Sequence, residues 1–190
     1  MKKTFCLAAL LVTAAAPAFA HPGHGAESFA AGVAHPLSGL DHIAAMIAVG
    51  LWSALKGGRA LWVWPATFVG LMLFGSALGM AQVPLALVEP GILASVVVLG
   101  LMTAFGVDLP VAAGAALIAV FALLHGHAHG SEAAETIAGI EYMGGFAITT
   151  AALHGAGIGF AQIMQRASLR PLVRLAGAAC VVAGCLMVLT

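Results

Sequence analysis

Imidazole and carboxylate side chains gather in a segment that leads directly into a long apolar run. Residues 35–42 read HPLSGLDH, which supplies His35, Asp41 and His42, and IAAMIAVGLW follows. An ionisable side chain inside a membrane span costs roughly 2.5–3.5 kcal/mol on insertion scales, so it usually marks a function. Neutral imidazole and carboxylate together suit divalent transition metals such as Ni²⁺, Co²⁺, Zn²⁺ and Cu²⁺. The segment therefore indicates a metal site near the start of an apolar helix.

A second group of such side chains closes the fourth apolar run, where the chain reads LLHGHAHGSE. Its members are His125, His127, His129 and Glu132. His125 and His129 can share an ion if a helix continues that far, because residues four apart lie on one helical face. The glycines within the segment could instead end the helix, so both geometries are open. Glu141, about one turn into the next run, is the expected ligand from a third segment.

Spacing limits which residues of the first group can share an ion. His35 and His42 are seven residues apart, which is roughly 10 Å along a straight helix. They can bind one metal only if the backbone breaks, and the proline and glycine between them favour such a break. The deeper candidate site pairs Asp41 with His42 and is completed by Glu141 or by a histidine of the fourth run.

Three further histidines lie outside these groups. His154, in LHGAGIG, lies thirteen residues beyond Glu141, or about 20 Å deeper at helical rise. It is either a ligand on the exit side or a residue that forms hydrogen bonds between helices. Cleavage after Ala20 would leave His21 as the first residue of HPGHG, with His24 nearby. The free amine and the imidazole of His21 can chelate a metal together, which predicts a weak metal-collecting tail.

The composition predicts that the elements positioning these residues are membrane helices. The chain has 190 residues, of which 62% are hydrophobic and only 7% charged, and its mean hydropathy is +1.09. A soluble domain usually has about a quarter charged residues. We therefore expect an all-α, polytopic membrane helix bundle in a lipid bilayer. The formal net charge of zero argues against a nucleic-acid partner.

The apolar runs predict a signal peptide followed by six transmembrane helices. Residues 1–20 combine a positive start, a short apolar core and an AFA cleavage site, as a secretory signal does. A short periplasmic tail, 21–33, precedes a transmembrane domain, 34–190, in which each run is near the length of about twenty residues that a span needs. The predicted spans are 34–55, 61–81, 88–107, 109–126, 137–163 and 171–189.

The distribution of basic residues predicts the orientation. All seven Lys and Arg residues fall on one side of the membrane in this arrangement, which the positive-inside rule assigns to the cytoplasm. They are Lys2, Lys3, Lys56, Arg59, Arg166, Arg170 and Arg174. The protein is therefore expected in a bacterial inner membrane, with a periplasmic N-terminus after cleavage and a periplasmic C-terminus. The two histidine groups and Glu141 then all lie in the periplasmic half, which favours one shared metal site.

Smaller features carry structural predictions. Asp108 precedes Leu-Pro at a predicted helix start and is expected to be a cap. Gly75 and Gly79 have the four-residue spacing that lets membrane helices approach closely. Cys180 and Cys185 face different sides of a helix, so no disulfide is expected.

The two histidine segments resemble the signatures of the HupE/UreJ family of nickel permeases. HPLSGLDH matches HPxxGxDH, and HGHAHGSE is similar to FHGxAxGxE, with Leu124 in place of the Phe. The resemblance covers essentially the whole chain. It implies Ni²⁺, with Co²⁺ as the alternative, entering a cytoplasm in which a hydrogenase or urease is matured. The matching positions imply metal-binding roles for His35, Asp41, His42, His125 and Glu132, whereas His127 and His129 fill less constrained places.

The predicted function is a secondary permease that moves Ni²⁺ from the periplasm into the cytoplasm. We expect no enzymatic activity and no permanently bound cofactor, and the sequence has no Walker loop for ATP. The alternative is a membrane-bound metal-binding accessory protein or sensor that does not transport. An intramembrane serine protease would need Ser38 beside His154, and the predicted depths keep them apart. A haem protein would need paired histidines at matched depth, and His42 and His154 lie at different depths.

Overall fold

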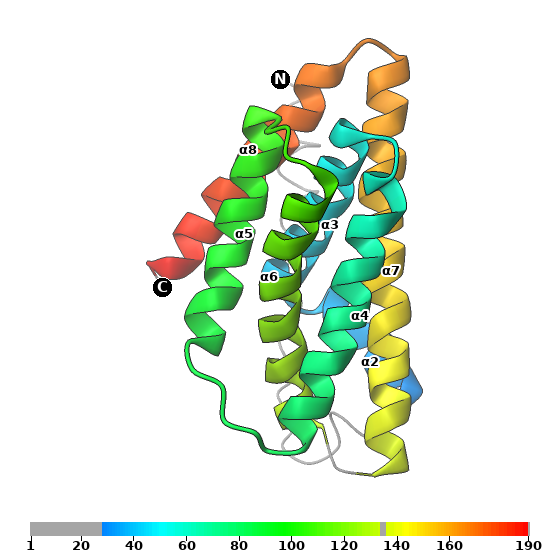
Figure 1. The fold of residues 1–190 in the computed structure, drawn as a ribbon, viewed down its shortest axis with the longest axis vertical. Helices are drawn as coiled ribbons and strands as arrows, with labels where there is room; N and C mark the ends of the chain where they lie inside the picture. Colours follow the sequence, from blue (N-terminus) through cyan, green and yellow to red (C-terminus); the bar gives the residue numbers. More distant parts are fainter. Residues whose placement is uncertain (1–27, 134–135, 190) are drawn as a thin grey trace, which may run out of the picture.

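In the computed structural model, residues 28–133 and 136–189 are described, and all regular elements within them are helical (Figure 1). The predicted signal peptide, together with His21 and His24, lies outside the described residues. The elements are α2 (Phe29–Ala34), the 3₁₀ turn η1 (His35–Leu37), α3 (Leu40–Lys56), α4 (Ala60–Met80), α5 (Val88–Phe105), α6 (Val111–Glu132), α7 (Ile137–Arg166) and α8 (Arg170–Val188).

Five of these helices, α4 to α8, are long and apolar enough to cross a membrane. The bent pair formed by α2–η1 and α3 makes a sixth crossing if it is counted as one span. The chain is therefore a multi-pass membrane protein with an all-helical fold, as the composition predicts.

The first predicted span is broken rather than continuous. Phe29–Leu37 and Leu40–Lys56 meet at an angle of 81°. Pro36 lies at the start of the 3₁₀ turn, and Gly39 is the extended residue that precedes α3. Proline disrupts a continuing helix and suits a helix start. The break that the sequence permitted is present, and α3 starts at Leu40, within the predicted span 34–55.

The fourth predicted span is longer than expected, because α6 continues to Glu132. The glycines that could have ended it face α4 instead. A Cβ added at Gly126 would overlap the backbone carbonyl of Met72, and one at Gly130 would overlap that of Ser76. These glycines serve close packing between helices, so helical geometry holds through the histidine segment.

The other side of this contact is built in the same way. A Cβ at Gly75 of α4 would overlap the carbonyl of Leu123, and one at Gly79 would overlap the carbonyl of His127. The predicted close packing at Gly75 and Gly79 is therefore confirmed. The α4–α6 contact therefore fixes the position of the α6 histidines along the long axis of the bundle.

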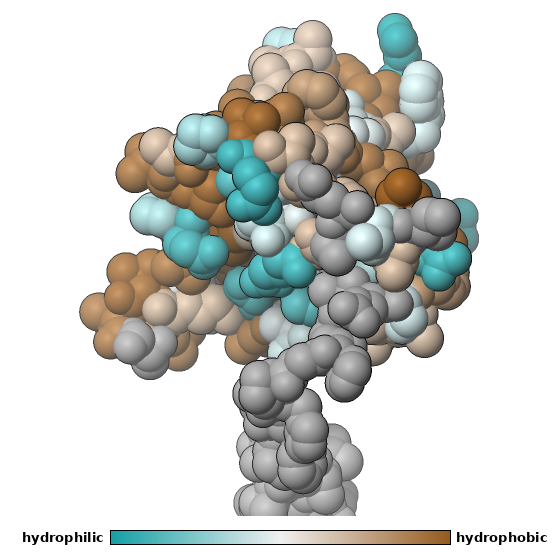
Figure 2. All heavy atoms as spheres, turned by 90° about the horizontal axis from the view of Figure 1, so that it is seen from below, coloured by the Kyte–Doolittle hydropathy of each residue, from teal (hydrophilic) through white to brown (hydrophobic). Residues whose placement is uncertain are grey.

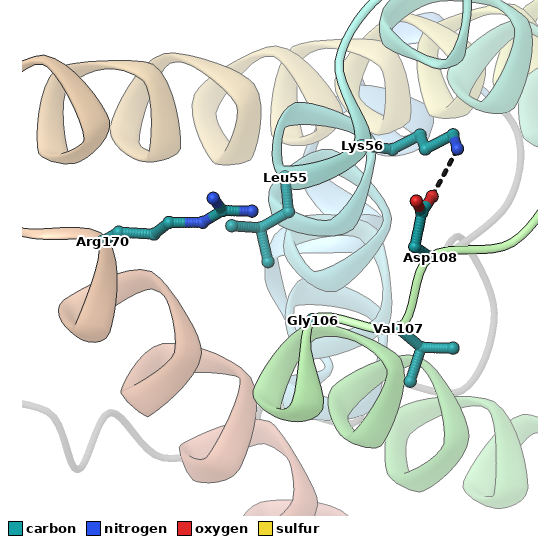
Figure 3. A pocket seen from close by; sticks show the side chains of 6 residues that line it. All are labelled: Leu55, Lys56, Gly106, Val107, Asp108 and Arg170. Atoms are coloured by element: carbon teal, nitrogen blue, oxygen red, sulfur yellow. Dashed lines mark hydrogen bonds and ion pairs between the residues drawn. The ribbon is translucent and has the colours of Figure 1, made fainter.

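One end of the bundle carries the described Lys and Arg residues, at the α3–α4 and α7–α8 connections near the top of Figure 1. A cavity of about 110 Å³ at this end is lined in part by Lys56, Asp108 and Arg170, and Lys56 forms an ion pair with Asp108 (Figure 3). Pro110, not Asp108, occupies the position before α6, and no side chain caps this helix start. The predicted capping role of Asp108 is therefore wrong, because its carboxylate pairs with Lys56 at the end of α3.

The helix α3 is the centre of the bundle and packs against α4, α5, α7 and α8. Most of its length is buried, including Trp52 and Met46. Its N-terminus brings Asp41 and His42 to the end opposite the basic residues. Cys180 and Cys185 are free thiols, as predicted.

Candidate metal centre

Four imidazoles and two carboxylates meet at the end of the bundle away from the basic residues. They are His35 on η1, Asp41 and His42 on α3, and His125, His129 and Glu132 on α6. Figure 2 shows this end, where hydrophilic side chains gather among hydrophobic ones. The sequence predicted all six as metal ligands.

The His42 imidazole is oriented by Asp41. Its Nδ1 donates to Asp41 Oδ1 at 2.9 Å, and its backbone N–H donates to the same oxygen at 2.9 Å. Because an ionised carboxylate only accepts, Nδ1 carries the proton and Nε2 presents a lone pair. A carboxylate behind the imidazole is the usual support of a metal-bound histidine.

The His129 imidazole mirrors this arrangement from α6. Its Nδ1 lies 3.5 Å from Glu132 Oε2, an ion-pair distance without the alignment of a hydrogen bond. Its Nε2 is in direct contact with Nε2 of His42. Both rings are buried, with 4% and 6% of His129 and His42 exposed. Two ring nitrogens that converge with carboxylates behind them form a donor set for a divalent cation.

The bend before α3 brings His35 into the same cluster. Its ring centroid lies 4.8 Å from that of His129 and 6.4 Å from that of His42. One ligand atom from each of His35, His129 and Glu132 lies within 4.8 Å of the others. A straight helix would separate His35 and His42 by roughly 10 Å, and the break before α3 brings their rings closer together.

His125 extends the cluster inward from His129 by about one turn of α6. Its side chain is fully buried, and its ring centroid lies 5.2 Å from that of His42. Nδ1 donates to the carbonyl of Phe121 at 3.0 Å, and Nε2 has no hydrogen-bond partner among the described residues. A carbonyl cannot donate, so Nε2 is again the unprotonated nitrogen.

Aromatic side chains of α7 form the wall of the cluster. Phe146 is fully buried and stacks on His129 at 4.6 Å between centroids, and Tyr142 lies 5.7 Å from His35. Neither residue is among those that the sequence predicted at the site. Their four-residue spacing on one helical face was the available signal.

Glu141, predicted as the ligand from this third segment, is not part of the cluster. It is exposed, and no hydrogen bond or ion pair joins it to these histidines in the part of the chain that the structure describes. Successive helical residues point about 100° apart, and here Tyr142 has the inward position. The α7 position beside the histidines is therefore that of Tyr142 and not that of Glu141.

His127 points elsewhere although it lies between two members of the cluster. Its Nε2 donates to the carbonyl of Val83, in the α4–α5 connection, at 2.7 Å. The ring is buried, with 9% exposed. This geometry gives His127 a structural contact that joins α6 to a loop.

His154 on α7 is buried, with 1% exposed, and neither of its ring nitrogens has a hydrogen-bond partner among the described residues. Its ring centroid lies 5.0 Å from that of Phe68, which lies 5.6 Å from that of His125. His154 therefore shares a neighbour with the inner end of the cluster.

Comparison with known proteins adds a family to this geometry. The family model described as "HupE / UreJ protein" matches residues 8–187. Protein HupE of Rhizobium leguminosarum bv. viciae is 41% identical over 183 residues, which cover 96% of this chain and 95% of that relative. No solved structure is significantly similar.

Proposed function

Since the chain belongs to the HupE/UreJ family, which is not a family of enzymes, we propose that it is a permease for Ni²⁺, with Co²⁺ as the alternative cargo. The observation that carries this proposal is the convergence of His42 Nε2 and His129 Nε2, each with a carboxylate on the far side of its ring. Imidazole nitrogen favours Ni²⁺ and Co²⁺ over Mg²⁺ and Ca²⁺, which prefer oxygen.

The gradient of exposure supports a path rather than a closed structural site. The Glu132 side chain is 59% exposed and that of Asp41 is 29% exposed, whereas the rings between them are buried. A hydrated dication can meet the carboxylates first and then exchange its water for imidazole nitrogens. Such stepwise replacement of the hydration shell lowers the cost of entering a low-dielectric interior.

The placement of charge supports the direction of transport. The described Lys and Arg residues lie at the end opposite the histidines, and the positive-inside rule assigns that end to the cytoplasm. The metal cluster would then face the periplasm of a bacterial inner membrane. A dication moving inward gains about 4.6 kcal/mol per 100 mV of inside-negative potential, twice the value for one charge. Uptake of this kind would supply the maturation of a hydrogenase or urease.

Reconstitution into liposomes that contain a nickel-sensitive dye tests the proposal. The wild-type protein is expected to carry external Ni²⁺ inside, and His42→Gln and His129→Gln to abolish the signal because each removes one of the two converging nitrogens. Asp108→Asn is the matched control, since it removes a carboxylate from the opposite end. Wild-type protein that binds Ni²⁺ without any dye response would instead identify a non-transporting accessory protein or sensor.

A further inference from the structure

We propose that His125 and His154 form a second, inner binding position for the transported Ni²⁺ or Co²⁺ ion. This position receives the ion from the His42–His129 site. This inference rests on the proposed transport function. It assigns a ligand role to His154, which lies outside the cluster that the first two segments form.

His154 has the properties of a ligand rather than of a packing residue. It is 1% exposed in the middle of α7, and neither Nδ1 nor Nε2 has a hydrogen-bond partner within residues 28–133 and 136–189. A histidine that joined two helices by hydrogen bonds would use at least one of these nitrogens. A buried polar group without a partner is costly, so its retention calls for a group that it binds.

His125 supplies the other nitrogen donor, already in the required tautomer. Its Nδ1–H is held by the Phe121 carbonyl, and its buried Nε2 has no partner among the described residues. A backbone carbonyl behind the ring orients a metal-binding imidazole in the same way as a carboxylate does. Because the bond from Nδ1 to Phe121 already orients the ring, Nε2 is not needed to hold the ring in place and is available to bind an ion.

The rings form a continuous series from the outer site to His154. His42 contacts His125, with 5.2 Å between centroids, and Phe68 contacts both His125 and His154, at 5.6 Å and 5.0 Å. The Phe68 ring is thus in contact with both histidines and, among the described residues, is the single aromatic ring that links His125 to His154. An ion that leaves His42 has His125 and then His154 as its next nitrogen donors.

The surroundings of His154 differ from those of the outer site in charge. Thr150 lies one turn from His154 on α7, and Met72 lies one turn from Phe68 on α4. The Thr150 hydroxyl donates a hydrogen bond to the Met72 sulfur at 3.7 Å, and both side chains are fully buried. These groups are neutral, whereas Asp41 and Glu132 support the outer histidines. A dication is held less firmly where no carboxylate balances its charge. The inner position is therefore expected to bind more weakly, as release toward the cytoplasm requires.

The test counts bound ions in the full chain, purified in lipid nanodiscs, with Co²⁺ as the spectroscopic probe. The wild type is expected to bind one Co²⁺ tightly and a second one more weakly. His154→Gln keeps a polar side chain and His154→Phe keeps the shape of the ring, and both are expected to lose only the weaker ion. Transport by the same variants in liposomes should fall at least about tenfold, by analogy with the loss of groups that tune metal sites.

The matched control is His127→Gln, which alters another buried histidine of the same bundle and should keep both ions and the wild-type rate. A wild type that binds a single Co²⁺ would overturn the inner position. So would His154→Gln and His154→Phe variants that bind two ions and transport normally. If the wild type binds two ions, loses one in both variants and yet carries no metal into liposomes, the inner position stands and the permease proposal fails.

Discussion

His42 and His129 each place a carboxylate at Nδ1 and direct Nε2 to the same point. The carboxylates therefore act in two ways. Asp41 fixes which nitrogen of His42 carries the proton, and both carboxylates balance the charge of a bound dication. Residues that supply these effects should be distinguishable from acidic residues that only lie nearby in the sequence.

Glu132 and Glu141 provide that distinction. Glu132→Gln is expected to weaken Ni²⁺ binding about 10–100-fold, because it removes the charge beside His129 Nδ1. Glu141→Gln should leave binding unchanged, because its side chain is exposed and forms no hydrogen bond or ion pair with the cluster among the described residues. Isothermal titration of both variants with Ni²⁺ measures the difference. Equal losses of Ni²⁺ affinity in the two variants would show that binding depends on the total charge at this end of the bundle and not on the position of Glu132 beside His129.

The sequence was sufficient to select the candidate ligands on η1, α3 and α6 but not the facing wall on α7. Histidine and aspartate are conspicuous in an apolar run, because burying them is costly. Tyr142 and Phe146 are not conspicuous, since aromatic residues are common in any core. Glu141 was chosen for its charge, and only the structure shows that Tyr142 has the buried position beside His35.

At the scale of helices, glycine determines how closely α4 and α6 approach. Adding a methyl group at Gly75 would bring it into the Leu123 carbonyl, whereas the same change at Gly70 on α4 meets open space. Gly75→Ala is therefore expected to lower the free energy of unfolding by roughly 1–3 kcal/mol, as overpacking does. Gly70→Ala should have no comparable effect.

Thermal unfolding in detergent, followed by circular dichroism, compares the two variants. The displacement of α6 should also move His125 and His129, so Gly75→Ala is expected to weaken Ni²⁺ binding. Equal melting temperatures for Gly75→Ala, Gly70→Ala and the wild type would contradict the close α4–α6 contact.

The boundaries of these helices show the limits of local sequence signals. Glycine after His125 is compatible with both the end of a helix and a helix contact, and the choice depends on the presence of α4, which is distant in sequence. The break between α2–η1 and α3 was foreseeable from Pro36 and Gly39, but its 81° angle was not. That angle depends on the packing of α2 against α7, where a Cβ at Gly32 would overlap the Tyr142 carbonyl.

At the scale of the whole molecule, the two ends of the bundle differ in chemistry. One end gathers imidazoles and carboxylates, and the other gathers the basic residues of the α3–α4 and α7–α8 connections (Figures 1 and 2). Hydropathy and charge alone predicted this division, because span length and the positive-inside rule act on the entire chain. Under the proposed function, the basic end faces the cytoplasm, and a metal path from the histidine end toward the basic end follows the direction in which an inside-negative potential drives a cation.

The most direct test of the account is X-ray absorption at the nickel edge on the Ni²⁺-loaded protein, its His42→Gln variant and its His129→Gln variant. We expect the wild type to show scattering from at least two imidazole rings, and each variant to lose one ring from the same nickel environment. Nickel bound without imidazole, or a spectrum that is identical in all three proteins, would contradict an ion shared by His42 and His129.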